Sequence, residues 1–380
     1  MNILVIKSRH IGDVLLTGPL LSTLRLRHPD SHITVLVKAG TEAMLTGHPH
    51  VDAVITFPVR RPGEGRVAFL IRQWLWLRGL RQRRPDRVFN TTEGDRGVIA
   101  TFVSGGVQRI GFRRQRGDKW WRRGLLTHTL LPRGGIRHTV LHNLDLVGEG
   151  PQDRHVHLRF AAADAGRAER LLREAGWDGE RPLVQIHPAS RWRFKCWTVH
   201  GMAGVADFCA QQGCQVVLTT SPDAGEIALA AAIAQAGHQP VINLGGLLTL
   251  KELAALTARC RLFFGVDTAP MHMAAAMDVP VIALYGPSGT YDWGPWPNGW
   301  AGDGSPFGRL NGVQESFPHW VIQKTWSCVP CGRAGCEGSK RSRCLEELTL
   351  AEVLPLVEQV LRREGLWQGT GEPATREQDG

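Results

Sequence analysis

Two residues with short polar side chains, Asp267 and Thr268, follow an apolar run that ends at Gly265. Pro270 lies two residues after Thr268, and proline is tolerated in the first turn of a helix. A helix is therefore predicted to begin after Thr268, shortly after the end of a strand. A helix N-terminus presents free N–H groups and the positive end of the helix dipole, which favours phosphate binding. An ordinary helix cap would use the same residues.

A second group of candidates comes from the segment HPASRWRFKCW, in which a predicted strand ends at His187 and Lys195 follows in a loop rich in arginine and tryptophan. A lysine opposite the helix terminus at Asp267 would complete a site for a diphosphate. A third candidate, Asp13, lies after the opening strand NILVIK, where its carboxylate could act as a base or cap a helix that begins at Val14.

One carboxylate and one anion site suit a transferase that inverts the configuration of a sugar bound to a nucleoside diphosphate. The base takes a proton from the acceptor hydroxyl, and positive charge stabilises the leaving diphosphate. Glycoside hydrolysis normally needs two carboxylates, and Asp13 has no obvious second partner, although Glu93 and Asp95 after the predicted strand RVFNTT could serve as one. The chain has neither G-x-G-x-x-G nor G-x-x-x-x-G-K-[ST], which disfavours dinucleotide oxidoreductases and P-loop enzymes.

The elements that must position these groups alternate between strand and helix, which indicates parallel sheets that carry ligand sites at the carboxyl ends of their strands. The alternation restarts after the helix AAADAGRAERLLREAGW, so two doubly wound, Rossmann-like α/β domains are expected. The predicted parts are an N-terminal domain (1–160), a C-terminal domain (161–345), a last helix (346–365) and a disordered tail (366–380).

Charge is unevenly spread over the 380 residues. Residues 1–150 hold 24 Lys and Arg against 11 Asp and Glu, whereas the remainder holds 21 against 24. Arginines alternate with tryptophans in two stretches of the first half, VAFLIRQWLWLRGLRQRRPDRVF and RIGFRRQRGDKWWRRG. Such a surface suits a phosphorylated glycan or an anionic membrane surface, although a solvated charged face would look the same. No nucleic-acid recognition motif is present, so no nucleic-acid partner is expected.

The N-terminus places a strand-like run before its basic residues, unlike a signal peptide, and no run approaches the roughly 18 apolar residues of a membrane span. We therefore expect a cytoplasmic protein. Four scattered cysteines are expected to be buried free thiols: Cys196, Cys209, Cys214 and Cys260.

Four further cysteines are clustered near the end of the chain in CVPCGRAGCEGSKRSRC, namely Cys328, Cys331, Cys336 and Cys344. Their proximity in a cytoplasmic chain fits a structural zinc ion or an iron–sulfur cluster better than disulfides. The paired C-x2-C…C-x2-C pattern is absent, and reduced thiols in a surface loop are the simpler interpretation.

The ordered set GDVLLT, HPASRWRFKCW, GVDTAPMHMAAA and LYGPS resembles glycosyltransferase family 9, the lipopolysaccharide heptosyltransferases, over roughly residues 1–365. IGDVLLT, DTAPMHMAAA and the cysteine-rich end are most similar to the heptosyltransferase III branch, which adds the third heptose of the inner core.

This resemblance implies a GT-B fold, an ADP-heptose donor on the C-terminal domain and a lipopolysaccharide core acceptor on the N-terminal one. It assigns Asp13 as the general base and implies that no metal cofactor is required for turnover. Donor contacts are expected from His187, Lys195, Asp267, Thr268, Ala269 and His272. Acceptor contacts are expected from Arg60, Arg61, Glu93 and Arg113.

One of these positions departs from the family pattern. Ala269 stands where the heptosyltransferases that add the first heptoses usually have glycine. Because alanine disfavours a positive φ, a close approach of its backbone to phosphate requires a negative φ.

The expected activity is thus transfer of L-glycero-D-manno-heptose from ADP-heptose to a heptose of the inner core, peripherally at the inner face of the bacterial inner membrane. The same fold with another nucleotide-sugar donor is one alternative. A non-catalytic protein that binds phosphorylated glycan is the other.

Overall fold

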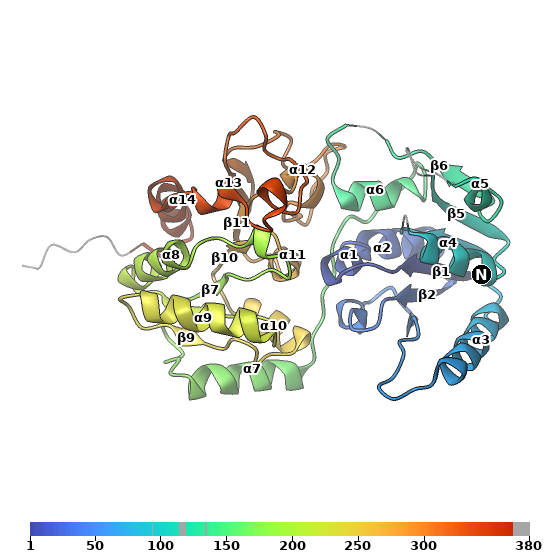
Figure 1. Ribbon diagram of the computed structural model, residues 1–380, viewed down its shortest axis with the longest axis horizontal. Helices are drawn as coiled ribbons and strands as arrows, with labels where there is room; N and C mark the ends of the chain where they lie inside the picture. Colours follow the sequence, from blue (N-terminus) through green and yellow to red (C-terminus); the bar gives the residue numbers. More distant parts are fainter. Residues whose placement is uncertain (93, 114–118, 134, 368–380) are drawn as a thin grey trace, which may run out of the picture. The chain divides into compact units, whose positions relative to one another are not determined.

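The computed structural model describes residues 1–92, 94–113, 119–133 and 135–367, which form two compact units (Figure 1). The first unit comprises Met1–Phe160 together with Ala275–Met277 and Tyr291–Gly308. The second comprises the rest of the chain from Ala161 onward.

The first unit is built on a six-stranded sheet whose described pairings are all parallel, in the order β3-β2-β1-β4-β5-β6. Its central strands are nearly continuous apolar runs, as a sheet covered on both faces requires. The strands are β1 (Asn2–Lys7), β2 (His32–Val37), β3 (Ala53–Thr56), β4 (Arg87–Asn90), β5 (Gln108–Phe112) and β6 (His128–Leu130).

Helices alternate with these strands, and the chain passes from β1 into two short helices in succession. The first helix begins at Ile11, three residues before the predicted start at Val14, so Asp13 lies inside its first turn. The helices are α1 (Ile11–Leu15), α2 (Gly18–Arg27), η1 (Glu42–Met44), α3 (Arg66–Gln82), α4 (Asp95–Val103), α5 (Trp120–Arg123) and α6 (Thr139–Asp145).

The second unit has a seven-stranded sheet in the order β12-β13-β11-β10-β7-β8-β9, and among its described residues the pairing is antiparallel only between β12 and β13. The chain thus crosses from β9 at one edge to β10 near the middle. The strands are β7 (Leu183–His187), β8 (Gln215–Leu218), β9 (Ile242–Asn243), β10 (Leu262–Val266), β11 (Val281–Tyr285), β12 (Gln314–Ser316) and β13 (His319–Gln323).

The helices of this unit include the last helix of the chain, which supplies five buried side chains, such as Val353 and Leu361, to the same core as β7 and β10. It is therefore part of the second unit rather than a separate element. The helices are α7 (Ala162–Glu174), η2 (Arg193–Lys195), α8 (Val199–Gln211), α9 (Ala224–Ala236), α10 (Leu250–Thr257), α11 (Ala269–Ala276), α12 (Thr290–Trp293), η3 (Cys336–Gly338), α13 (Arg343–Glu346) and α14 (Leu350–Arg363).

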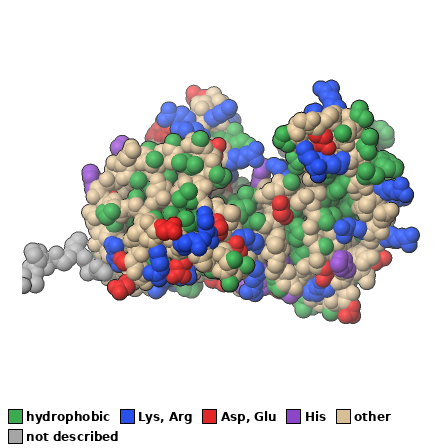
Figure 2. Space-filling model, turned by 90° about the horizontal axis from the view of Figure 1, so that it is seen from below, with side chains coloured by type: hydrophobic (Ala, Val, Ile, Leu, Met, Phe, Trp, Pro, Cys, Tyr) green, Lys and Arg blue, Asp and Glu red, His purple; other side chains and the backbone are tan. Residues whose placement is uncertain are grey.

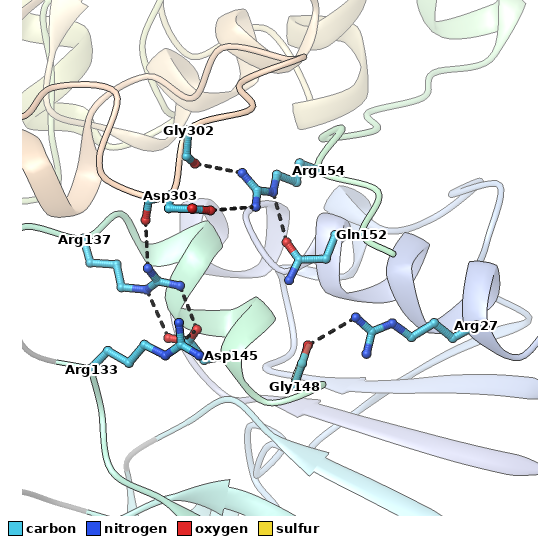
Figure 3. A network of polar contacts seen from close by, with 9 residues as sticks. All are labelled: Arg27, Arg133, Arg137, Asp145, Gly148, Gln152, Arg154, Gly302 and Asp303. Carbon is cyan, nitrogen blue, oxygen red and sulfur yellow. Dashed lines mark hydrogen bonds and ion pairs between the residues drawn. The ribbon is translucent and has the colours of Figure 1, made fainter. Parts of the chain in front are cut away.

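Residues 291–308, expected in the second domain, belong to the first unit. Trp296 is fully buried there, and its Nε1 donates a hydrogen bond of 3.0 Å to the carbonyl of Arg154. The neighbouring segment is held by arginines, since Arg137 donates to the carbonyl of Asp303 at 2.8 Å and pairs with Asp145 at 2.7 Å (Figure 3). A late stretch of sequence thus completes the early unit.

The expectation of a disordered tail from residue 366 is wrong at its start. Leu366 is buried, and Trp367 packs at 5.9 Å between ring centroids on Phe208. The rest of that expectation, residues 368–380, lies outside the described residues. Within the described part of the chain, no helix combines the length and the apolar character needed to cross a bilayer.

Candidate functional site

The predicted donor residues gather at the carboxyl edge of the second unit's sheet. His187 ends β7 and is in parallel register with Gly265 of β10, so the loops after these two strands are neighbours. His187 is buried, and its Nδ1 lies 3.0 Å from the hydroxyl of Thr219, which follows β8. Burial lowers the pKa of His187 to about 3, so this imidazole is neutral and supplies no positive charge.

Lys195 supplies a positive charge at this edge. Its Nζ lies 2.5 Å from Oδ2 of Asp267, and both side chains are largely buried, with 21 % and 8 % of their surfaces exposed. Lys195 comes from η2 after β7, whereas Asp267 directly follows β10, so the parallel pairing of these strands brings the two together. The prediction placed both residues at one edge but did not predict that they pair.

Helix α11 begins at Ala269, directly after Asp267 and Thr268. Ala269 is helical and is absent from the residues with positive φ in the described chain, so the negative φ required of alanine is found. His272 lies one turn later and is buried. The helix terminus therefore adjoins the Lys195–Asp267 pair, and the two share one edge of the sheet.

Asp13 lies in the first unit, after β1 and within α1. Its Oδ1 is 3.5 Å from Nζ of Lys7, the last residue of β1, and its side chain is 15 % exposed. Nζ of Lys7 also donates a hydrogen bond of 3.2 Å to the carbonyl of Thr91 after β4. This arrangement holds the Asp13 carboxylate at the carboxyl edge of the sheet while leaving it partly open to solvent.

The sequence interpretation missed Lys7, although a signal was present. Lysine is out of place at the end of the apolar run NILVIK, and in the structure its side chain is only 6 % exposed. A buried lysine is expected to have a partner, and here the neighbouring turn provides it.

The predicted acceptor residues are spread along the first unit. Arg60 and Arg61 are exposed in the loop after β3, where Arg60 donates to the carbonyl of Glu64 at 2.7 Å. Arg113 follows β5, which is separated from β3 by three strands, so the structure does not bring it next to that loop through the sheet. Glu93 lies outside the described residues.

Arg96 was not among the predicted residues, yet it joins two of these loops. Its guanidinium lies 4.5 Å from the ring centroid of Phe57 and donates to the carbonyl of Pro58 at 3.4 Å. The start of α4 is thereby fastened to the loop that follows β3. Sequence alone offered no reason to prefer this arginine over its many neighbours.

The sulfur atoms of the clustered cysteines are spread apart in the structure. No three of the four sulfur atoms lie within 4.8 Å of one another, whereas sulfurs around a tetrahedral zinc ion are separated by about 3.8 Å. Cys344 is buried, and burial raises its pKa to about 11, with the other three cysteines adding to the effect. Of the scattered thiols, Cys209, Cys214 and Cys260 are buried as predicted, but Cys196 is only half-buried.

The fold, with two doubly wound α/β units, is that of the GT-B glycosyltransferases. A glycosyltransferase family 9 structure from Veillonella parvula DSM 2008 superposes on this chain with a TM-score of 0.76. The superposition covers 95 % of this chain and 97 % of the Veillonella chain, at 21 % sequence identity. The ADP-heptose lipopolysaccharide heptosyltransferase II of Escherichia coli gives 0.73, with coverages of 96 % and 100 % at 22 % identity.

Sequence comparison identifies the family. The profile of glycosyltransferase family 9 (heptosyltransferase) matches residues 75–302. The lipopolysaccharide heptosyltransferase 3 of Escherichia coli is 31 % identical over 78 % of this chain and 87 % of its own length. The chain therefore belongs to glycosyltransferase family 9 and is a glycosyltransferase.

Proposed function

We propose that this enzyme transfers L-glycero-D-manno-heptose from ADP-heptose to a heptose of the lipopolysaccharide inner core, as the third heptose. The observation that carries the proposal is the 31 % identity with heptosyltransferase 3 over most of both chains. The geometry of the two sheet edges supports it, because each holds one of the groups that an inverting transfer needs.

In the proposed reaction, the Asp13 carboxylate takes the proton from the acceptor hydroxyl. The acceptor oxygen then forms a bond to the anomeric carbon of the heptose as the bond from that carbon to the diphosphate breaks, so ADP leaves with the electron pair. Lys7, 3.5 Å from Asp13, orients the carboxylate. General base catalysis of this kind contributes about 10²–10⁴-fold in rate.

On the donor side, Lys195 and the N-terminus of α11 would stabilise the negative charge that develops on the diphosphate. Asp267 fixes the ammonium of Lys195 in position before the donor arrives, at 2.5 Å. Thr268, Ala269 and His272 are the further donor contacts in this proposal, and His187 would contact the donor as a neutral hydrogen-bonding group. No divalent cation is needed for this arrangement, because a lysine and a helix dipole supply the positive charge.

On the acceptor side, the first unit would meet a phosphorylated, lipid-anchored core at the inner face of the inner membrane. Arg60, Arg61 and Arg113 would pair with phosphates, and Glu93 would contact sugar hydroxyls. Helix α3 supports the membrane part of this proposal, since of its 17 residues only Leu80 is buried. Figure 2 shows hydrophobic side chains of the first unit at the surface beside Lys and Arg side chains.

The exposed apolar residues of α3 are large. Leu70 is 61 % exposed, Trp74 57 % and Leu75 55 %, and the guanidinium of Arg78 lies 5.7 Å from the Trp74 ring centroid. A helix with apolar and basic side chains at its surface suits the interface of an anionic bilayer. We therefore place α3 against the membrane from which the acceptor is presented.

The test is a transfer assay with purified protein, ADP-heptose and core acceptors that carry one or two heptoses, read by mass spectrometry without added metal. A heptose mass increment is expected on the two-heptose acceptor. Asp13→Asn should reduce turnover by about 10²–10⁴-fold while leaving ADP-heptose binding nearly unchanged. Release of free heptose without acceptor would instead indicate a hydrolase.

Other outcomes would redirect the proposal. Binding of ADP-heptose without transfer to either acceptor would point to a different acceptor, whereas failure to bind it would favour another nucleotide-sugar donor. Unchanged glycan binding in Asp13→Asn, with no turnover in the parent protein, would favour the non-catalytic alternative. A structural zinc ion at the clustered cysteines stays a prediction, and metal analysis of a Cys328→Ser, Cys331→Ser variant tests it.

A further inference from the structure

A cluster of histidines and one carboxylate lies in the first unit outside the groups assigned to transfer. His50, from the loop between η1 and β3, meets Asp153 and His157, from the segment that ends this unit. One potential ligand atom from each of the three residues lies within 4.8 Å of the other two. Residues more than one hundred positions apart in the sequence thus place two imidazoles and a carboxylate at one point.

Two further histidines surround this cluster. The rings of His48 and His157 are 5.4 Å apart between centroids, and those of His155 and His157 are 4.4 Å apart. His50 and His157 are separated by 5.5 Å between centroids. Four imidazole rings thus lie together in this part of the first unit.

The Nε2 atom of His157 is a possible metal ligand whose hydrogen-bonding capacity the described residues leave unused. It is buried and has no hydrogen-bond partner in the described part of the chain. Buried polar atoms in proteins are nearly always satisfied, and an orphan calls for an unseen ion or water.

The backbone around Asp153 is held in place. Its N–H donates to the hydroxyl of Thr23 on α2 at 3.0 Å, and that hydroxyl donates to the Asp153 carbonyl at 3.1 Å. The neighbouring Arg154 donates to the Gln152 side chain at 3.0 Å and to the carbonyl of Gly302 at 2.8 Å, as Figure 3 shows. The carboxylate is therefore presented from a fixed point.

The ligating groups also have supporting hydrogen bonds. Oδ1 of Asp153 accepts a hydrogen bond of 3.0 Å from the N–H of His155. The N–H of His50 donates to Nδ1 of His48 at 3.2 Å, which fixes the turn that carries the His50 ring. Such outer partners orient metal ligands. The ligand atoms lie within 4.8 Å of one another, so side-chain rotations that move them by about 1 Å would bring them to the roughly 3.3 Å that separates the ligands of a tetrahedral ion.

We propose that His50, Asp153 and His157 bind a divalent first-row transition-metal ion, with Zn²⁺ the best fit. Two nitrogen ligands and one oxygen ligand suit Zn²⁺, Co²⁺ or Ni²⁺ and not Mg²⁺ or Ca²⁺, which prefer oxygen throughout. Three protein ligands leave a position for water. The ion fastens the loop before β3 to the end of the first unit, and its role is structural, separate from heptose transfer.

The experiment measures thermal unfolding and isothermal titration of the full chain, treated with chelator and then titrated with Zn²⁺. Zinc should bind with a dissociation constant below about 10 µM. At a free zinc concentration about one hundred times that constant, the unfolding temperature should rise by about 5 °C. His50→Gln should abolish this shift without changing the unfolding temperature of the metal-free protein. His32→Gln, which removes an imidazole that is 55 % exposed, is the matched control and should keep the shift.

The clustered cysteines must be separated from this site. The double variant Cys328→Ser, Cys331→Ser removes two exposed thiols. In this variant the rise in unfolding temperature with zinc should persist, and bound Co²⁺ should show no thiolate charge-transfer band. Loss of the shift in that cysteine variant would overturn the proposal, as would survival of the shift in His50→Gln. Zinc binding weaker than about 100 µM in the parent protein would also overturn it.

Discussion

The carboxyl edge of the second unit and the surface of the first are built in different ways. At the edge of the second unit, Lys195 and Asp267 form a largely buried pair next to the buried His187. In the first unit, Arg60 and Arg61 are exposed and lie in the loop that leads to α3, whose apolar side chains are also exposed. One region presents few charges in fixed positions, and the other presents many charges over a broad area.

This difference matches the two substrates that the enzyme is proposed to join. A nucleotide sugar is small, and its diphosphate can be held by one lysine and one helix terminus that are placed before it binds. A lipid-anchored glycan is large and carries several phosphates, so its affinity can be shared among exposed arginines and the exposed apolar side chains of α3. On this contrast, single substitutions should have their largest effects at the edge of the second unit.

Replacing Lys195 by Met should weaken ADP binding by about 10²-fold and also destabilise the second unit. The destabilisation follows because Asp267 would be left as a buried carboxylate without its partner, at a cost of about 3 kcal/mol. The double variant Lys195→Met, Asp267→Asn should recover the unfolding temperature but not ADP binding. Calorimetry and titration of ADP on the parent protein and the two variants give the answer, and recovery of both properties in the double variant would show that the lysine is only structural.

Removing apolar surface from α3 should affect membrane binding and leave the donor site untouched. The double variant Leu70→Gln, Leu75→Gln should lower partitioning to anionic vesicles by about tenfold to one hundredfold, since each leucine would otherwise bury apolar area in the interface. Leu247→Gln, in the second unit and 54 % exposed in the parent, is the matched control. Vesicle sedimentation measures the effect, and equal losses in both variants would contradict the placement of α3.

Acidification should destabilise the second unit by a moderate amount. Burial lowers the pKa values of His187 and His319 from 6.5 to about 3, so below pH 6.5 the unfolded chain binds protons that the folded unit cannot. Stability should therefore fall as pH falls, by about 1.4 kcal/mol per pH unit for each histidine. His187→Asn should halve that slope, as followed by hydrogen exchange of second-unit peptides between about pH 6.5 and 5, and an unchanged slope would refute the assignment.

The strands that position the site were predictable because their sequences are plain apolar runs. NILVIK and LFFGV became β1 and β10, and Pro270 correctly marked the first turn of α11. By contrast, β5 was read as part of a basic block, because Gln108 and Arg109 obscure its apolar character. The strand pair β12 and β13 was missed for a related reason, since both are short and lie in a region rich in glycine and tryptophan.

Contacts between distant residues were less predictable than elements. The rule that ligand sites lie at the carboxyl ends of parallel strands correctly placed Lys195 and Asp267 at one edge. Their ion pair was not foreseen, because pairing depends on the reach of a side chain from a short helix. The cluster of His50, Asp153 and His157 was not predicted, although the stretches HPH and DRHVH carry closely spaced histidines, because only the fold brings these two distant stretches together.

The return of residues 291–308 to the first unit has a consequence for biosynthesis. Trp296 and the hydrogen bond from its Nε1 to Arg154 complete that unit, so its fold cannot be finished while only residues 1–160 have been made. At about 5–20 residues per second, the ribosome needs roughly 7–30 s more to supply the missing stretch. During that interval the nascent chain carries an incomplete unit, and a fragment that stops at residue 160 should never leave that state.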